Sequence, residues 1–180
     1  MHSVELLPDE STENAVRDVW EGLARAGLPS LAAHRHPTNR PHLTLATSDV
    51  LPPDVCERLE EALVVLPVPL RLDGLVRFTG GRTYVLAWAV SPDDALMRLH
   101  ATVRHILRGA PGNERSRPLH NPARWVPHVS LARGRGGPVV AADADMFLTA
   151  AGTATGALEG RWTGARTYDS ESRTTAPLGL

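Results

Sequence analysis

The chain has 180 residues, 42% of them hydrophobic, and a formal net charge of -1 at neutral pH. This composition supports a core of ordinary size and excludes disorder for most of the chain, and the charge argues against tight non-specific binding to long nucleic acid. Cys56 is the only cysteine, which excludes an internal disulfide and a cysteine-based zinc cluster.

The first half of the chain predicts alternating strands and helices. The apolar residues of each helical segment recur at helical spacing, and prolines or glycines separate the segments. Residues 29–41 contain three prolines and the run His34-Arg35-His36, and they lead directly into the predicted strand over 42–47. The predicted elements are a strand over 2–7, a helix over 11–26, a strand over 42–47 and a helix from Pro52 to about Leu66.

The rest of the chain continues the same alternation. Ser91-Pro92-Asp93-Asp94 is typical of a helix start, with Ser91 as the cap, Pro92 at the first helical position and acids at the positive end of the helix dipole. The predicted elements are strands over 68–78 and 83–90, a helix ending before Gly109, a loop over 110–124, a strand over 125–132, a helix over 138–150 and strands over 154–162 and 164–169.

One short phrase occurs twice. Pro41-His42-Leu43-Thr44-Leu45-Ala46 returns 86 residues later as Pro127-His128-Val129-Ser130-Leu131-Ala132. Four positions are identical, and the other two keep an apolar residue and a hydroxyl. Because side chains alternate along a strand, each copy should bury an aliphatic face and present an imidazole beside a hydroxyl on the other.

The repeated motif strands indicate an ancient duplication. Each follows a predicted helix, and the surrounding strands read as antiparallel. We therefore expect an α+β fold with helices packed outside, in which residues 1–180 form a single bilobal catalytic domain with one motif in each half.

Two histidines held on opposite sides of one phosphorus atom are suited to in-line phosphodiester chemistry. If the motif strands lie together about a pseudo-two-fold axis, His42 and His128 face one another. A neutral imidazole would take the proton of the attacking water or hydroxyl, and a charged one would protonate the departing oxygen. This scheme requires no metal and no other cofactor.

The motif hydroxyls and nearby arginines complete the predicted site. Thr44 and Ser130 would donate hydrogen bonds to the non-bridging phosphate oxygens. Arg133 and Arg40 are the nearest candidates for binding the phosphate. Residues 98–135 contain eight arginines and one acid, which fits either an anionic ligand near the second motif or a solvated basic face.

Both motifs resemble those of the two-histidine (2H) phosphoesterase superfamily, in particular its 2'-5' RNA ligase-like branch. The flanking Arg40-Pro41 and Trp125-Val126-Pro127 share this resemblance. It implies a bilobal, pseudo-two-fold duplicated fold whose antiparallel sheets line a central cleft. It also implies metal-independent action on 2',3'-cyclic phosphate ends or related 2'-linked phosphodiesters. The residues matched by position are His42, Thr44, His128 and Ser130.

The same resemblance implies His42 as the acid and His128 as the base in hydrolysis. After the first motif the chain reads Ala46-Thr47-Ser48, where bacterial RNA cyclic phosphodiesterases of this branch continue with basic and aromatic residues. The implied partner is an RNA terminus or small nucleotide bearing a cyclic phosphate.

A non-catalytic nucleotide- or phosphate-binding module with the same cleft is the alternative function. Binding alone would not need two proton carriers, so the intact motifs favour the enzyme. The start of the chain lacks the features of a secretion signal, and its longest near-apolar run, residues 62–70, is too short to cross a membrane. We therefore expect a cytoplasmic protein without a membrane contact; no protein partner is evident.

Other side chains allow more than one interpretation. Trp125 and Tyr168 could stack on a nucleobase or belong to the core. His100 and His105, five residues apart on a predicted helix, are expected at the surface or its boundary.

Overall fold

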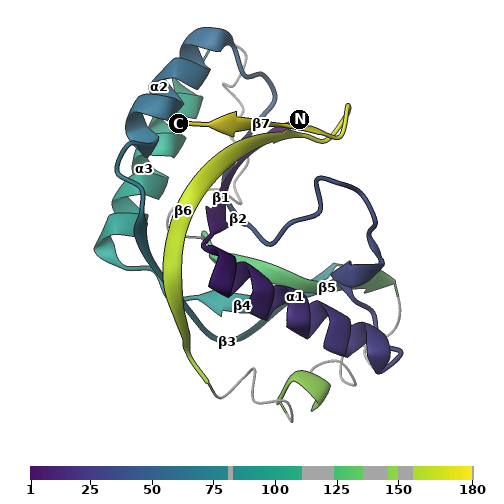
Figure 1. Cartoon of the computed structure of the whole chain (residues 1–180). Coiled ribbons are helices and arrows are strands. Elements are labelled where there is room, and N and C mark those ends of the chain that lie inside the picture. The colour runs from purple at the N-terminus through teal and green to yellow at the C-terminus, as the bar shows by residue number, and fades with distance from the viewer. Residues whose placement is uncertain (81–82, 111–123, 136–145, 150–155, 180) are drawn as a thin grey trace.

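The computed structural model describes residues 1–80, 83–110, 124–135, 146–149 and 156–179 (Figure 1). Residues 146–149 form a helical turn. The helices and strands, in chain order, are β1 (His2–Pro8), α1 (Glu10–Arg25), the 3-10 helix η1 (Leu31–Ala33), β2 (Leu43–Ser48), α2 (Pro53–Leu63), β3 (Val68–Gly80), β4 (Thr83–Val90), α3 (Asp94–Arg108), β5 (His128–Arg135), β6 (Leu158–Asp169) and β7 (Thr174–Leu178).

The described strands form one antiparallel sheet in the order β2-β1-β6-β3-β4-β5, with β7 paired to β6. The sheet consists of two wings, β2-β1-β6 and β5-β4-β3. From the centre of the sheet outward, β6 corresponds to β3, β1 to β4 and β2 to β5. If the two halves of the chain are taken as the segment from β1 to β3 and the segment from β4 onward, each wing takes its motif strand and middle strand from one half and its inner strand from the other. The α+β, antiparallel, duplicated fold is thus confirmed, and the predicted sheets are the wings of one sheet.

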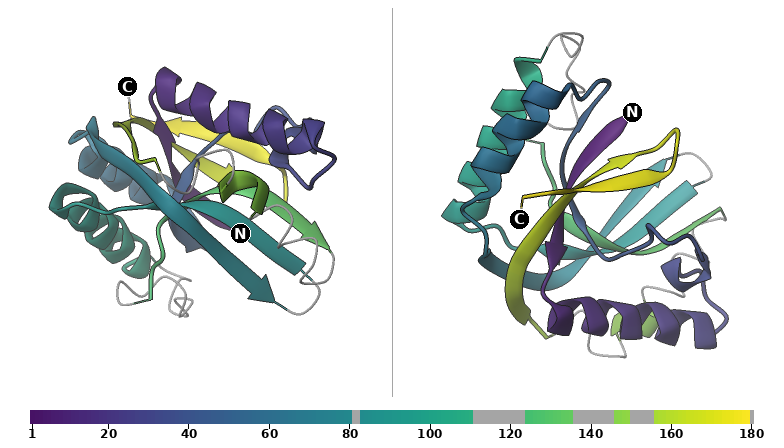
Figure 2. Two further views of the ribbon diagram at one scale, coloured as in Figure 1. Left: turned by 90° about the horizontal axis from the view of Figure 1, so that it is seen from below. Right: turned by 45° about the horizontal axis from the view of Figure 1, so that its top comes forward.

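The helices cross between the halves in the same way. Helix α1 follows β1 but contacts β5, and α3 follows β4 but contacts β2. Helices α2 and α3 lie side by side on one side of the molecule, and α1 lies on another (Figures 1 and 2). Phe147 of the short helical turn lies 3.7 Å from the Cβ position of Gly22 in α1. Helices from both halves of the chain therefore contact each wing, since α1 contacts β1, β5 and β6 and α3 contacts β2 and β3.

The apolar residues of both motif strands belong to the core, as predicted. Leu43, Leu45, Val129 and Leu131 are each at most 1% exposed. Their burial against the helices leaves the other side of each strand for the motif histidines and hydroxyls. We call the side that carries His42, Thr44, His128 and Ser130 the motif face.

Three predicted boundaries are corrected by the structure. The cap of α3 is Asp93, whose side chain accepts a hydrogen bond from the Leu96 amide at 2.8 Å, while the Ser91 amide donates to the Arg71 carbonyl. The second motif strand begins at His128 and not at residue 125. The two strands predicted over 154–162 and 164–169 are the single strand β6, and the C-terminal tail adds β7.

Some predicted elements fall outside the described residues. These are nearly all of the loop over 110–124, the start of the strand over 154–162, and most of the helix over 138–150, of which residues 146–149 are described and helical. No helix within the described ranges is long and apolar enough to span a membrane.

Candidate active site

Each motif histidine is held by the same kind of hydrogen bond, from its ring Nδ1 to the backbone carbonyl two residues earlier. The Nδ1 atom of His42 lies 2.7 Å from the carbonyl oxygen of Arg40, and Nδ1 of His128 lies 2.7 Å from that of Val126. Because a carbonyl oxygen can only accept, Nδ1 carries a proton in each ring. The Nε2 atom of each imidazole is thus left to exchange protons with a ligand.

Each motif strand contains a β-bulge at the same place in the repeated phrase. Leu45 is the extra residue of β2 opposite β1, and Leu131 is the extra residue of β5 opposite β4. The two residues that form each bulge are buried, Leu45 and Ala46 in β2 and Leu131 and Ala132 in β5. A bulge reverses the alternation of side chains beyond it. Arg133 therefore lies on the motif face, where simple alternation would place it toward the core, and Thr47 has the corresponding place in β2.

Each motif strand accepts a hydrogen bond from one tryptophan of the opposite half of the chain. The indole Nε1 of Trp20, in α1, donates to the carbonyl oxygen of Ser130 at 3.0 Å. The indole Nε1 of Trp125 donates to the carbonyl oxygen of Thr44 at 3.3 Å. These two bonds, together with the contact between β2 and β5, bring the strands at the two ends of the sheet order close to each other.

Trp125 is also stacked on His100 of α3, with ring centroids 3.8 Å apart and an angle of 5° between the planes. His100 is fully buried, so its expected surface position is wrong. The stacking explains the error, because the imidazole packs between α3 and the segment that leads into β5. Trp125 thus has a structural partner on one ring face.

The surroundings of His42 are charged. Its Nε2 lies 3.7 Å from the carboxylate of Glu5, a residue of β1 whose side chain is only 4% exposed. Glu5 is bound by Arg166 of β6 at 2.8 Å and by the hydroxyl of Ser3 at 2.8 Å. Because a buried carboxylate needs such partners, Glu5 is held in place beside the imidazole. A protonated His42 would be a further partner for it.

The surroundings of His128 are apolar. Its ring lies against Phe78 of β3, with centroids 4.6 Å apart, and its neighbour across the strand pair is Ala89 of β4. Burial lowers the pKa of His128, the charge of His42 lowers it further, and the bond to the Val126 carbonyl opposes both. His128 therefore favours the neutral form.

The two candidate phosphate-binding arginines differ in their partners. The guanidinium of Arg40 is bound to Glu13 of α1 at 2.5 Å, and Glu13 also binds Arg17 at 2.8 Å. Arg133 is exposed, and it forms no ion pair with any residue that the structure describes. The site residues absent from the sequence-based set are Glu5, Phe78 and Trp20. An acid between two apolar residues of a predicted strand was the available signal for Glu5.

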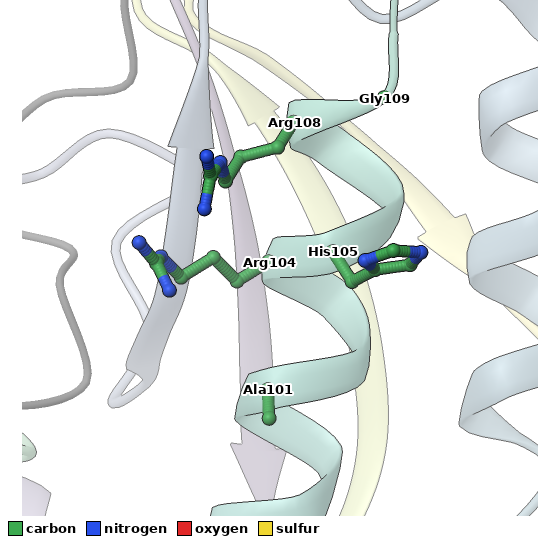
Figure 3. Close-up of a pocket in the computed structure, with 5 residues that line it drawn as sticks. All are labelled: Ala101, Arg104, His105, Arg108 and Gly109. Carbon is green, nitrogen blue, oxygen red and sulfur yellow. The ribbon is translucent and has the colours of Figure 1, made fainter.

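Two surface pockets are lined by residues other than the motif histidines. One, of about 450 Å³, is lined by Arg104, Arg108 and other residues of α3 and its C-terminal glycine. Figure 3 shows these two arginines extending to the same side of the helix and His105 extending to the other. The second pocket, of about 350 Å³, lies between α1 and residues 32–39. Among the described residues, no group of three or more His, Cys, Asp or Glu side chains could hold a metal ion.

Comparison with known proteins places these features in a family. The model of the 2'-5' RNA ligase superfamily matches residues 8–164. No curated protein matches the chain.

Several solved structures share the fold. TT0787 of Thermus thermophilus has a TM-score of 0.63 at 19% identity, covering 98% of this chain and 94% of its own. Usb1 of Kluyveromyces marxianus with uridine monophosphate has a TM-score of 0.56 at 15% identity, covering 99% and 98%. LigT of E. coli complexed with ATP has a TM-score of 0.52 at 16% identity, covering 98% and 93%.

Proposed function

The chain belongs to the 2'-5' RNA ligase superfamily of two-histidine phosphoesterases, and we propose that it hydrolyses 2',3'-cyclic phosphate ends, or related 2'-linked phosphodiesters, of RNA or small nucleotides without a metal. The mirrored pair of imidazoles, each with Nδ1 bound to a carbonyl and Nε2 left to act, carries the proposal. Uridine monophosphate and ATP in two structures with this fold support a nucleotide ligand.

Each motif histidine has one proton to move in the proposed reaction. The Nε2 atom of neutral His128 takes a proton from a water molecule, and the oxygen of that water attacks phosphorus. The bond from phosphorus to the 2' or 3' oxygen breaks on the opposite side, and charged His42 gives that oxygen a proton. One proton enters the enzyme and one leaves it, so His128 ends charged and His42 neutral until solvent restores both.

The unlike surroundings of the histidines support this division of roles. The apolar contact with Phe78 favours an imidazole that starts neutral, as a base must. The carboxylate of Glu5 lies 3.7 Å from Nε2 of His42, where it can pair with the charged imidazole that the proposed acid requires.

The remaining motif-face residues are proposed to bind the phosphate. Thr44 and Ser130 donate hydrogen bonds to its non-bridging oxygens as negative charge develops there. Arg133 is the stronger of the two candidate arginines, because Arg40 already shares the carboxylate of Glu13. We treat residues 1–180 as the one bilobal unit that carries all of these groups.

The test is turnover of 2',3'-cyclic mononucleotides in the presence of EDTA. We expect His42→Ala and His128→Ala each to lower kcat by roughly 10²–10⁴-fold, the usual value of a positioned proton carrier. His105→Ala, which removes an exposed histidine of α3, should retain the wild-type rate and is the matched control.

Saturable nucleotide binding without any product, in the wild type as in the variants, would instead identify the non-catalytic binding module. Wild-type rates in either motif variant would also contradict the proposed function. Rates lost only in EDTA would contradict the metal-independent mechanism while leaving the substrate class intact.

A further inference from the structure

The pocket between α1 and residues 32–39, here called the α1–η1 pocket, has the composition of a nucleotide site. Its lining includes the cationic or titratable side chains Arg17, His34, Arg35 and His36, together with Trp20 and Asn39. Its volume of about 350 Å³ lies at the lower end of the range for small-molecule sites. It can hold one nucleotide unit and not a folded nucleic acid.

This pocket is connected to both motifs. Trp20, at its base, is the residue whose indole is bonded to the carbonyl of Ser130. Asn39, on its rim, lies three residues before His42 in the chain. The Asn39 side chain donates to the carbonyls of Leu31 at 2.9 Å and His34 at 2.8 Å, which fixes the loop. The pocket therefore adjoins the elements that carry both motifs, β5 through Trp20 and η1, and the entry to β2 through Asn39.

The charges around the pocket leave one arginine available for an anion. Arg17 is bound to Glu13 and lies 5.8 Å from the ring of Trp20, and Glu21 is paired with Arg25 at 3.8 Å. Arg35 is exposed and, within the described part of the chain, has no carboxylate partner. A guanidinium without a carboxylate partner, in a pocket that an aromatic side chain also lines, suits a phosphate joined to a ribose and base.

The α3 pocket in Figure 3 lacks these connections. All of its lining residues come from one helix and the glycine that follows it, and none is bonded to a motif strand. Its arginines and His105 lie in the last turns of α3, where cations already stabilise the end of a helix.

We propose that the α1–η1 pocket binds the phosphate and nucleoside that precede the reacting end, so that the substrate is an RNA strand of two or more nucleotides in preference to a mononucleotide. This inference rests on the proposed function, since it names the substrate class of the same site. Arg35 binds the phosphate, and the rim of His34 and His36 contacts the sugar and base.

The experiment compares two substrates that end in the same cyclic phosphate, cytidine 2',3'-cyclic phosphate and a trinucleotide ending in it. We expect the trinucleotide to have at least a tenfold higher kcat/KM. Arg35→Ala should bring the ratio of the two values close to one, and Arg35→Lys should restore part of it. The matched control is Arg58→Ala, which removes an exposed arginine of α2. A purely structural defect would lower both values together and leave the ratio unchanged.

Salt dependence provides a second measurement of the same contact. The ratio should fall with rising salt in the wild type, because a phosphate contact releases counterions, and should not fall in Arg35→Ala. The pocket assignment would be overturned if the wild type had nearly the same kcat/KM for the trinucleotide and the mononucleotide, or if Arg35→Ala left the ratio of these two values unchanged. Neither result would affect the proposed function.

If neither substrate is turned over, the proposed function fails and the pocket is tested by binding. A fluorescently labelled trinucleotide with a 3'-phosphate should then bind roughly tenfold more weakly to Arg35→Ala than to the wild type or Arg58→Ala. Equal binding by all three proteins would overturn the pocket assignment as well.

Discussion

His42 and His128 make the same Nδ1 hydrogen bond, yet their neighbours differ in charge and polarity. Glu5 lies beside one ring and Phe78 beside the other. The two motifs thus hold their imidazoles alike, and residues of β1 and β3 make the surroundings of the two rings unequal. This asymmetry has a measurable consequence for the dependence of rate on pH.

We predict that kcat/KM rises with pH with a midpoint below about 6.5, the ordinary pKa of histidine. The pKa of His128 is lowered by burial and by the charge of His42, and a base acts only in its neutral form. Phe78→Ala should admit water to the ring and move the midpoint upward, toward 6.5. A pH–rate series of kcat/KM measures both values.

Phe78→Leu is the control for this prediction, because it keeps an apolar side chain over the imidazole and should leave the midpoint nearly unchanged. If activity instead falls as pH rises through the same region, with no acidic limb, then His128 is the acid and the assigned roles are reversed.

The sequence was sufficient to single out the four motif residues as candidates but not to predict their surroundings. His42, Thr44, His128 and Ser130 could be found because one phrase occurs twice, and repetition is visible without a structure. Glu5 and Phe78 occur once each, on strands whose places beside the motifs depend on sheet order. Their roles could therefore not be predicted from spacing along the chain.

At the scale of the elements, the paired β-bulges have the clearest effect on where a candidate site residue lies. Arg133 lies three residues after Ser130, an odd separation that would point it toward the core in a regular strand. The extra residue at Leu131 turns it onto the motif face. A bulge leaves little trace in the residue types, which explains why the sequence could suggest Arg133 but could not supply the geometry.

We predict that Arg133→Ala lowers kcat/KM roughly tenfold to a hundredfold, as expected for one charge-assisted hydrogen bond of about 1.5–3 kcal/mol. Arg133→Lys should recover part of this loss. Steady-state kinetics on a cyclic mononucleotide is the measurement, with Arg58→Ala as the control. An unchanged rate in Arg133→Ala would remove this residue from the proposed site.

The start of α1 is fixed against β6 by a close contact. Asp9 caps α1 by accepting a hydrogen bond from the Thr12 amide at 2.8 Å, and it also accepts from the amide of Arg161 in β6. A Cβ at Gly160 would collide with Thr12 Oγ1 and lie 2.7 Å from Asp9 Oδ2. The absence of a side chain at Gly160 thus lets the helix approach the strand.

Gly160→Ala should therefore destabilise the fold by about 1–3 kcal/mol, the usual cost of overpacking. Gly164→Ala is the matched control in the same strand, since its Cβ would meet Leu7 at an ordinary 3.8 Å. Thermal unfolding followed by circular dichroism should show a melting temperature several degrees lower for Gly160→Ala only. Equal melting temperatures for the two variants would show that this contact does not limit the packing of α1.

Most element boundaries followed from local signals, and the exceptions have local causes. The Ser91-Pro92 start was wrong by two residues because the Ser91 amide is used in the sheet, which leaves Asp93 to cap α3. The division of β6 into two strands was wrong because its pairing with β1 continues on both sides of residue 163, at Trp162 and at Gly164, with only a shift of register between them.

At the scale of the whole molecule, the two halves exchange their inner strands and their covering helices. The repeated phrase predicted the duplication, but nothing in residue spacing distinguishes two separate lobes from halves that cross. The exchange places Trp20 of the first half on the second motif and Trp125 of the second half on the first. The spacing of the two imidazoles is thereby set by both halves together.

The configuration at phosphorus after turnover is the most direct test of two histidines acting on one phosphate from opposite sides. The substrate is a uridine 2',3'-cyclic phosphorothioate of single configuration, hydrolysed in ¹⁸O-labelled water. One in-line step, with His128 activating the water and His42 protonating the departing oxygen, predicts inversion. Retention would show two successive displacements through a phosphorylated enzyme and would contradict the account.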